Sequence, residues 1–219
     1  MSLKLYGHPF SSYCQKVLIA LYENATPFEF RVLSPDHPEI AAEHAKLWPL
    51  KRFPVLADGD RTVLEASLIV EYLDQRYAGS SRLIPEDRDA ALQVRTLDRF
   101  FDNYVMTPMQ AVVFDAIRPA DQRRPYIVTE AFDQLDVAYG WLEGELQGRK
   151  WAIGDDFGLA DCAAAPSLFY ADWVRPIGSE FPTVRAYRER LLSRPSFARA
   201  VNEARPYRSF FPLGAPDCD

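Results

Sequence analysis

The sequence predicts two domains of different fold class: an α/β domain over residues 1–78 and an all-α domain over residues 89–219, joined by a linker at 79–88. Two observations support this division. Segments with the two-residue alternation of strands occur only before residue 65, whereas the apolar patterns beyond the linker have helical spacing. Strands and helices followed by helices alone indicate two separate folding units.

The first domain opens with a strand, a helix and a second strand. Leu3–Tyr6 and Phe28–Leu33 alternate apolar and polar side chains, as half-buried strands do. Between them a helix runs through Lys16–Tyr22, with Ser11 or Ser12 as its N-cap. The three elements form a βαβ unit if the two strands are parallel.

The second half of this domain is predicted to be helix, strand, strand and helix. A short helix is expected near 39–45, and 53–56 is a strand with a proline at its start. The segment 58–60 has the composition of a hairpin turn and leads into a fourth strand at 61–64. Apolar residues at helical spacing follow over 65–77.

Small and polar residues at 78–81 interrupt the apolar pattern and begin the linker. The second domain is then predicted to consist of five helices, over Asp87–Phe114, Pro125–Leu146, Leu159–Trp173, Val184–Leu192 and Ser196–Glu203.

The composition is that of an ordinary globular protein and excludes some classes of partner. Hydrophobic residues make up 48% of the chain and charged residues 26%, so disorder is not expected. The formal net charge of -6 gives no general attraction to nucleic acid or to an anionic membrane. An anionic ligand must therefore be held by a local cluster of cations and backbone N–H groups.

Cysteine usage and the N-terminal residues predict a cytoplasmic protein. Cys14, Cys162 and Cys218 have no repeated spacing, which argues against a disulfide framework. The first residues lack the basic start and apolar core of a signal peptide, and no apolar run has membrane-spanning length. Without a CxxC pair, and with scattered histidines, no metal site is expected.

Ser11 and Ser12 stand where the first strand leads into the first helix. A helix start offers unpaired N–H groups and the positive end of the macrodipole, which lower the pKa of a thiol placed there. A serine hydroxyl at this point can donate a hydrogen bond to the thiolate, which makes a site for activating the thiol of a second molecule. The alternative is that these serines only cap the helix.

Two further segments carry groups that could bind an extended peptide. If the Phe53–Pro54 bond is cis, Phe53 can present its N–H and C=O to an extended peptide, whereas a trans bond would make it an ordinary strand edge. At the next helix start, free N–H groups of Ala66 and Ser67 suit a carboxylate, and Glu65 suits an amino group. The alternative for this segment is simple capping.

Five segments, taken in order, resemble the cytosolic glutathione transferases, in particular the bacterial, serine-type, theta- or zeta-like members. The resemblance covers nearly the whole chain and implies a thioredoxin-like first domain followed by an all-α domain. The segments that carry it are Tyr6–Val17, Phe53–Leu56, Leu64–Leu73, Gly154–Asp161 and Arg194–Ala200.

The resemblance implies that glutathione is the co-substrate and that its sulfur is the nucleophile. Ser11 matches the serine that hydrogen-bonds this sulfur in the serine-type classes. Ser12 is an alternative because the sequence does not fix the length of the preceding loop, and Tyr6 is another because other classes use a tyrosine near the first strand. Cys14 matches only the second, buried cysteine of thioredoxin-like redox proteins and is expected to pack in the core.

The resemblance also assigns the γ-glutamyl and cysteinyl parts of glutathione. Phe53, before Pro54, would pair its backbone with the cysteinyl part, and Glu65 with the N–H of Ala66 would hold the γ-glutamyl end. The family usually has serine where Ala66 stands, and Ser67 points elsewhere on the helix. Loss of that hydroxyl would weaken binding by about 1.5–3 kcal/mol unless another group compensates.

Two other positions complete the comparison with the family. Lys51 is the preferred ligand for the glycyl carboxylate among the basic residues before Phe53, with solvated surface charge as the alternative for each. In the second domain Gly158 stands where the family has serine or threonine, so the capping box with Asp161 is incomplete.

The electrophile is expected between the domains, against the first long helix of the second. Aromatic and methionine side chains suit flat apolar molecules, although the same residues are more often plain core. The candidates are Tyr104, Met106, Met109, Val113, Phe114 and Trp173.

These assignments predict a homodimeric glutathione transferase that conjugates a small hydrophobic electrophile. One alternative is a glutathione-dependent isomerase or dehalogenase on the same scaffold, and another is a glutathione-binding stress protein without transferase activity. A thioredoxin-type redox enzyme is disfavoured because the first cysteine is missing. The homodimer is implied by the resemblance alone.

Overall fold

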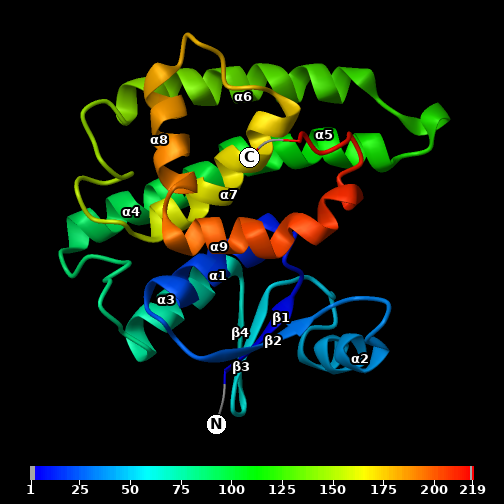
Figure 1. The fold of residues 1–219 in the computed structure, drawn as a ribbon, viewed down its shortest axis with the longest axis vertical. Coiled ribbons are helices and arrows are strands. Elements are labelled where there is room, and N and C mark those ends of the chain that lie inside the picture. Colours follow the sequence, from blue (N-terminus) through cyan, green and yellow to red (C-terminus); the bar gives the residue numbers. More distant parts are fainter. Residues whose placement is uncertain (1–2, 218) are drawn as a thin grey trace.

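The computed structural model describes residues 3–217 and 219 and begins with a four-stranded sheet (Figure 1). Its strands lie in the order β2-β1-β3-β4, and β1 is parallel to β2 and antiparallel to β3. The parallel pair confirms the βαβ unit predicted from the sequence. The strands are β1 (Leu3–Gly7), β2 (Phe28–Val32), β3 (Val55–Asp58) and β4 (Arg61–Leu64).

Helices cover both faces of this sheet. In Figure 1, α1 (Ser12–Glu23) and α3 (Ala66–Arg76) lie between the sheet and the helical domain, whereas α2 (Pro38–Leu47) lies on the opposite side. The alternation along β1 explains this arrangement, because Leu3 and Leu5 join the main core while Tyr6 packs with Ile40 of α2.

The predicted helix over 87–114 is a rod with a wider turn in its middle. It consists of α4 (Arg88–Phe100), the π-helical segment η1 (Phe101–Met106) and α5 (Thr107–Ile117). Pro108 has no N–H to donate to the preceding turn, and the Thr107 hydroxyl donates to the carbonyl of Asp102 at 3.0 Å. The hydrogen-bond ladder is thus interrupted where the helix widens.

The other predicted helices are all present, with ends within a few residues of the predicted ones. They are α6 (Pro125–Glu145), α7 (Leu159–Val174), α8 (Pro182–Leu192) and α9 (Pro195–Ala204). Short 3-10 turns at Ala120–Gln122 and Arg205–Phe210 were not predicted. Among the residues that the structure describes, no helix is long and apolar enough to cross a membrane.

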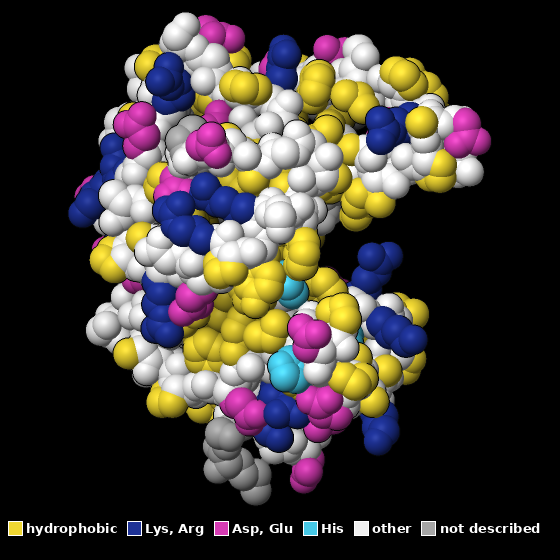
Figure 2. Space-filling model, turned by 45° about the vertical axis from the view of Figure 1, so that its right-hand side comes forward, with side chains coloured by type: hydrophobic (Ala, Val, Ile, Leu, Met, Phe, Trp, Pro, Cys, Tyr) yellow, Lys and Arg dark blue, Asp and Glu magenta, His cyan; other side chains and the backbone are white. Residues whose placement is uncertain are grey.

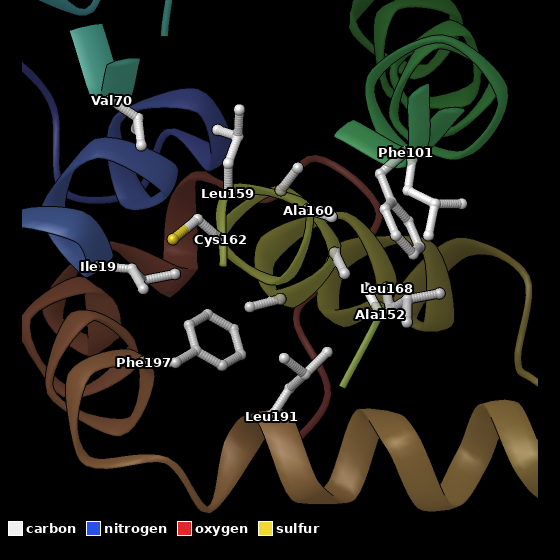
Figure 3. Close-up of a cluster of buried hydrophobic side chains, with 14 of the residues drawn as sticks. Ile19, Val70, Phe101, Ala152, Leu159, Ala160, Cys162, Leu168, Leu191 and Phe197 are labelled. Atoms are coloured by element: carbon white, nitrogen blue, oxygen red, sulfur yellow. The ribbon is translucent and has the colours of Figure 1, made fainter. Parts of the chain in front are cut away.

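Helix α7 forms the centre of the core that joins the two domains. Its N-terminal half packs against α1 and α3, and its other side packs against η1, α8 and α9 (Figure 3). The side chains around it include Ile19, Val70, Phe101, Leu191 and Phe197. The sheet domain is therefore held against the helical domain by continuous apolar packing.

Packing at the start of α7 explains why glycine stands at position 158, where the family has serine or threonine. A Cβ on Gly158 would lie 2.9 Å from the carbonyl oxygen of Leu83, so serine or threonine would not fit without movement. The carboxylate of Asp161 still accepts from the N–H of Gly158 at 2.9 Å, from the N–H of Ala152 at 2.8 Å and from the Tyr187 hydroxyl at 2.6 Å. Burial nevertheless raises the pKa of Asp161 to about 6.

Candidate active site

A cavity of about 810 Å³ lies between the sheet domain and the helical domain. Figure 2 shows this side of the molecule hollowed, with hydrophobic side chains gathered around the hollow. The N-termini of α1 and α3 and the loop before β3 supply one part of its lining, and α5 and the segment after α9 supply another.

Three parts of the lining differ in chemistry. The polar wall consists of Tyr13, Glu65, Ala66, Ser67, Arg99, Asp102 and Asn103. The basic loop consists of Trp48, Lys51, Arg52, Phe53 and Pro54. The apolar wall consists of His8, Phe10, Met109, Gln110, Val113, Phe114, Ile117, Tyr170, Phe210, Phe211 and Pro212.

Ser11 lines the cavity at the N-terminus of α1 and is the N-cap of that helix. Its Oγ accepts from the N–H of Cys14 at 3.4 Å, and its own N–H donates to the carbonyl of His8 at 3.0 Å. Since the cap uses a lone pair of the oxygen, the hydroxyl proton stays available to a ligand. Capping and thiol activation, predicted as alternatives, are therefore compatible.

The two alternatives to Ser11 occupy different places. Ser12 also lines the cavity, in the first turn of α1. Tyr6 is buried on the other face of the sheet, where its hydroxyl donates to Glu43 at 3.1 Å. The structure thus brings Ser11 and Ser12 to the cavity and leaves Tyr6 outside it.

Cys14 is fully buried behind this helix start. A Cβ on Gly7 would approach its Sγ to 2.4 Å, so the sulfur packs directly on the strand backbone. Burial raises the pKa of the Cys14 thiol to about 11, despite the bond to Ser11. A buried, protonated thiol agrees with the packing role predicted for it.

The basic loop presents Phe53 to the cavity. The Phe53–Pro54 bond is cis, the first of the two alternatives considered above. Within the described residues, no hydrogen bond engages the N–H or C=O of Phe53. The ring of His44, on α2, hydrogen-bonds the carbonyl of Arg52 at 2.9 Å and so fixes the loop, while Lys51 lines the cavity with a φ of 54°.

Glu65 precedes α3 in a backbone conformation that few residues adopt. Its φ is 68°, which costs about 1–3 kcal/mol in a residue other than glycine and is found mainly at functional sites. The first intrahelical bond runs from the N–H of Ile69 to the carbonyl of Glu65. The N–H groups of Ala66 and Ser67 therefore have no partner within the helix and can bind an anion.

A buried charge network supports the polar wall from behind. Lys16 of α1 is 1% exposed, and its Nζ lies 2.5 Å from Asp98 and 2.9 Å from Asp102. The Ser67 hydroxyl donates to Asp98 at 2.8 Å and accepts from Lys16 at 2.8 Å. Arg99, with a half-exposed side chain, pairs with both aspartates and with Ser67 at the cavity surface.

Burial raises the pKa of two acidic groups of this wall. It raises the pKa of Asp102, an effect that the neighbouring Lys16 opposes. It also raises the pKa of Tyr13 to about 12, so this hydroxyl remains a hydrogen-bond donor. The wall thus offers a cation, a carboxylate and neutral donors next to the N-terminus of α3.

The sequence analysis missed this network. Its only local signal is a lysine inside an apolar helix, together with two aspartates four residues apart on a later helix. Their pairing depends on how α1 packs against the rod of α4 and η1, which no sequence spacing encodes.

The residues predicted to meet the electrophile divide into two groups. Met109, Val113 and Phe114 line the cavity from α5. Met106 is buried in the core, and Tyr104 is 60% exposed on the outside.

Trp173 lies behind the apolar wall, 6.3 Å from Phe10 between ring centroids. It lines a separate cavity of about 360 Å³ between α5, α6 and α7. At the main cavity, the position expected for Trp173 is occupied by the C-terminal residues Phe210, Phe211 and Pro212. The sequence analysis did not predict them, because they have no periodic pattern that could indicate a pocket.

Metal ligands are not grouped in this site. Over residues 3–217 and 219, no cluster of three or more histidines, cysteines or acidic residues has the geometry to hold a metal ion.

Family models match most of the chain. The model described as glutathione S-transferase, N-terminal domain, matches residues 5–81, and the model described as glutathione S-transferase, C-terminal domain, matches residues 104–195.

Three relatives have similar sequences over most of their length. The chain is 32% identical over 168 residues to the glutathione S-transferase-like protein LUC7 of Fusarium sp., covering 75% of this chain and 73% of that protein. It is 28% identical to a probable maleylacetoacetate isomerase of Vibrio cholerae, over 94% of this chain and 98% of the relative. It is 26% identical to a stringent starvation protein A homolog of Haemophilus influenzae, over 93% and 92%.

Solved structures have the same fold. A glutathione S-transferase of Methylobacillus flagellatus with bound glutathione is 26% identical and superposes with a TM-score of 0.80, covering 91% of this chain and 98% of that one. A glutathione S-transferase of Methylobacterium radiotolerans in complex with glutathione sulfonate is 28% identical, with a TM-score of 0.77 and coverage of 92% and 95%. By sequence and by fold, the chain belongs to the cytosolic glutathione transferase superfamily.

Proposed function

We propose that the protein is a serine-type glutathione transferase that joins the glutathione sulfur to an apolar electrophile. One observation carries this proposal: Ser11 holds a free hydroxyl proton at the N-terminus of α1, inside a cavity that joins a polar wall to an apolar one. The positive end of the helix and the hydroxyl donor both favour a thiolate at this point. The apolar wall then supplies a dry surface for the molecule that the thiolate attacks.

In this proposal, the three residues of glutathione would lie in order along the cavity. Its γ-glutamyl carboxylate would accept from the N–H groups of Ala66 and Ser67, and its amino group would face Glu65. Its cysteinyl part would pair with the free backbone groups of Phe53. Its glycyl carboxylate would lie near Lys51.

Arg99 is the group best placed to replace the hydroxyl missing at Ala66. The Ser67 hydroxyl is not available, because its proton is donated to Asp98. The guanidinium of Arg99 lines the cavity and carries donors beyond those used by the aspartates. A charge-assisted bond to the γ-glutamyl carboxylate would contribute about 1.5–3 kcal/mol, similar to the loss at residue 66.

The reaction needs no redox step. The thiol gives its proton to solvent, the thiolate forms a bond to an electrophilic carbon, and either a leaving group departs or a π bond opens. The protein contributes a lower thiol pKa and a fixed orientation of the two reactants.

The test is the Ser11→Ala variant, assayed with glutathione and 1-chloro-2,4-dinitrobenzene. We expect turnover to fall about 100-fold, as it does when a hydrogen-bond donor to a developing anion is removed. Glutathione affinity, measured by calorimetry, should change little, because the γ-glutamyl and glycyl contacts remain.

Ser12→Ala is the matched control, since Ser12 lines the same cavity. It should retain most of the activity. If Ser11→Ala keeps full turnover, or if Ser12→Ala is the variant that loses it, the assignment of Ser11 is wrong.

A second function to consider is glutathione binding without turnover, as in a stress protein. Ala66 favours it, because the family's serine hydroxyl is absent there. Under this alternative, calorimetry would show glutathione binding while no electrophile is conjugated by the wild-type protein. The glutathione-dependent isomerase is less favoured, because a dicarboxylate substrate needs cations and the described residues of the apolar wall carry no formal charge.

We further propose that two copies associate through α3 and α4. Leu68 and Leu92 are 55% and 63% exposed on these helices, and burial against a second copy would remove this apolar surface from water. Light scattering on the purified protein should give twice the mass of the chain, and Leu92→Glu should shift it toward the monomer.

A further inference from the structure

The apolar wall contains few polar groups that can meet a ligand. Tyr170 is not available, because its hydroxyl accepts from the Gln15 side chain at 3.0 Å and donates to the carbonyl of Phe10 at 3.4 Å. Within the described part of this wall, the remaining polar side chains are those of His8 and Gln110. A polar atom of an electrophile that lies against this wall can therefore be met by one of these two side chains.

The tautomer of His8 follows from its local contacts. The N–H of Phe10 donates to Nδ1 of His8 at 3.2 Å, which requires that Nδ1 carry no proton. The proton of the neutral ring is then on Nε2, and no hydrogen bond from Nε2 to another described residue is found. Partial burial lowers the pKa of His8, which keeps the ring neutral at physiological pH.

Aromatic side chains of the C-terminal segment hold this ring in place. Tyr207 meets it edge-on at 4.5 Å between centroids, and Phe210 lies at 6.0 Å. The carbonyl of His8 accepts from the N–H of Ser11, so both residues belong to one turn at the same end of the cavity. His8 and Ser11 line the same cavity, so a donor on Nε2 belongs to the cavity in which the glutathione sulfur is proposed to lie.

We propose that His8 donates a hydrogen bond from Nε2 to a carbonyl oxygen of the electrophile, and that this residue favours neutral conjugated carbonyl compounds as substrates. The inference rests on the proposed function. A neutral donor on an uncharged wall suits an oxygen that is neutral in the substrate and becomes anionic during the reaction. Apolar side chains of α5, including Val113, Phe114 and Ile117, would cover the hydrocarbon part of such a molecule.

The chemistry balances without a further reactant. The glutathione thiolate forms a C–S bond to the β-carbon, and the electron pair of the C=C bond moves to give an enolate. The enolate oxygen accepts the hydrogen bond from His8, which keeps its own proton. The α-carbon then takes a proton from water, which replaces the proton that the thiol released.

The experiment compares two electrophiles in His8→Leu, trans-2-nonenal and 1-chloro-2,4-dinitrobenzene. The nitro groups, rather than a carbonyl oxygen, hold the charge that develops on the aryl chloride. We expect kcat/KM for the enal to fall about 10- to 100-fold, chiefly in kcat, and that for the aryl chloride to change less than about threefold. Glutathione affinity should be unchanged, and Gln110→Leu should affect the two substrates alike.

A second pair of variants tests the inference even if His8→Leu does not fold. Glutamine places its amide N–H near the position of Nε2, whereas asparagine places it near Nδ1. His8→Gln should therefore retain much of the activity with the enal, and His8→Asn should lose it. Equal losses with both electrophiles, or equal activity of the two amide variants, would overturn the inference while the transferase function stands. If the wild-type protein conjugates neither electrophile, the proposed function and this inference both fail.

Discussion

The polar wall and the apolar wall of the cavity are held in place by different forces. On the polar wall, Ser67 and Arg99 are tied by hydrogen bonds and ion pairs to the buried Lys16 and its two aspartates. On the apolar wall, side chains make aromatic contacts, such as Phe211 with Trp173 at 5.1 Å between centroids, and Phe210 remains 66% exposed.

These two kinds of support predict which end of the cavity can vary in sequence. A buried charge without its partner is strongly unfavourable, so the network permits one arrangement of its members. An aromatic or aliphatic side chain at a half-exposed position can be exchanged for another at little cost in free energy. We therefore expect the glutathione end to tolerate few substitutions and the electrophile end to tolerate many.

The largest effect is expected when the network loses its buried cation. Lys16→Met leaves Asp98 and Asp102 with the half-exposed Arg99 but without the buried cation that lies between them. Urea unfolding should show a loss of about 3–5 kcal/mol at pH 7. Without Lys16, the raised pKa of Asp102 rises further, so the folded state binds a proton more tightly than the unfolded state. The deficit should therefore be smaller at pH 5 than at pH 8.

Two controls show whether charge is the cause. Lys46→Met removes an exposed lysine and should change stability by less than about 0.5 kcal/mol. Lys16→Met combined with Asp98→Asn should recover part of the loss. A deficit of Lys16→Met that does not depend on pH would contradict an electrostatic origin and remove the distinction between the two walls.

Local patterns in the sequence predicted the fold and the part of the site that single segments form. The helix cap at Ser11 and the helix start at Glu65 each lie within a few residues, where spacing and turn chemistry determine the structure. The third strand was predicted over 53–56 and lies at Val55–Asp58, so Pro54 precedes the strand rather than belonging to it, and the sequence left open whether the Phe53–Pro54 bond is cis.

The rest of the site depends on contacts between distant segments. Lys16 reaches Asp102 across 86 positions of sequence, and the aromatic residues after α9 return to a turn at His8 near the start of the chain. Tyr104 and Trp173 are of residue types common in apolar pockets, but both lie outside the main cavity. Tyr104 lies on the outer side of the η1 turn, and the packing of α7 places Trp173 behind the apolar wall. A single sequence has no signal for such placements.

An intermediate effect is expected for the cation of the polar wall. Arg99→Leu should weaken glutathione binding by about 1.5–3 kcal/mol, roughly 10- to 100-fold in the calorimetric Kd. Adding Ala66→Ser in the same chain should restore part of the affinity, because the hydroxyl would then meet the same carboxylate. Arg95→Leu is the matched control, since Arg95 pairs with Glu71 outside the cavity. An unchanged Kd in Arg99→Leu would mean that another group holds the γ-glutamyl end.

The smallest effect is expected on the apolar wall. Phe210→Ala removes an aromatic ring that lines the cavity but is mostly exposed, so the melting temperature should barely change. The KM for an electrophile with a hydrocarbon tail should rise about threefold to tenfold, which corresponds to about 1 kcal/mol of lost apolar contact. Tyr126→Ala, at an exposed position of α6 outside the cavity, should leave KM unchanged. If Phe210→Ala weakens glutathione binding instead, the C-terminal segment also supports the glutathione end, and the two walls do not act independently.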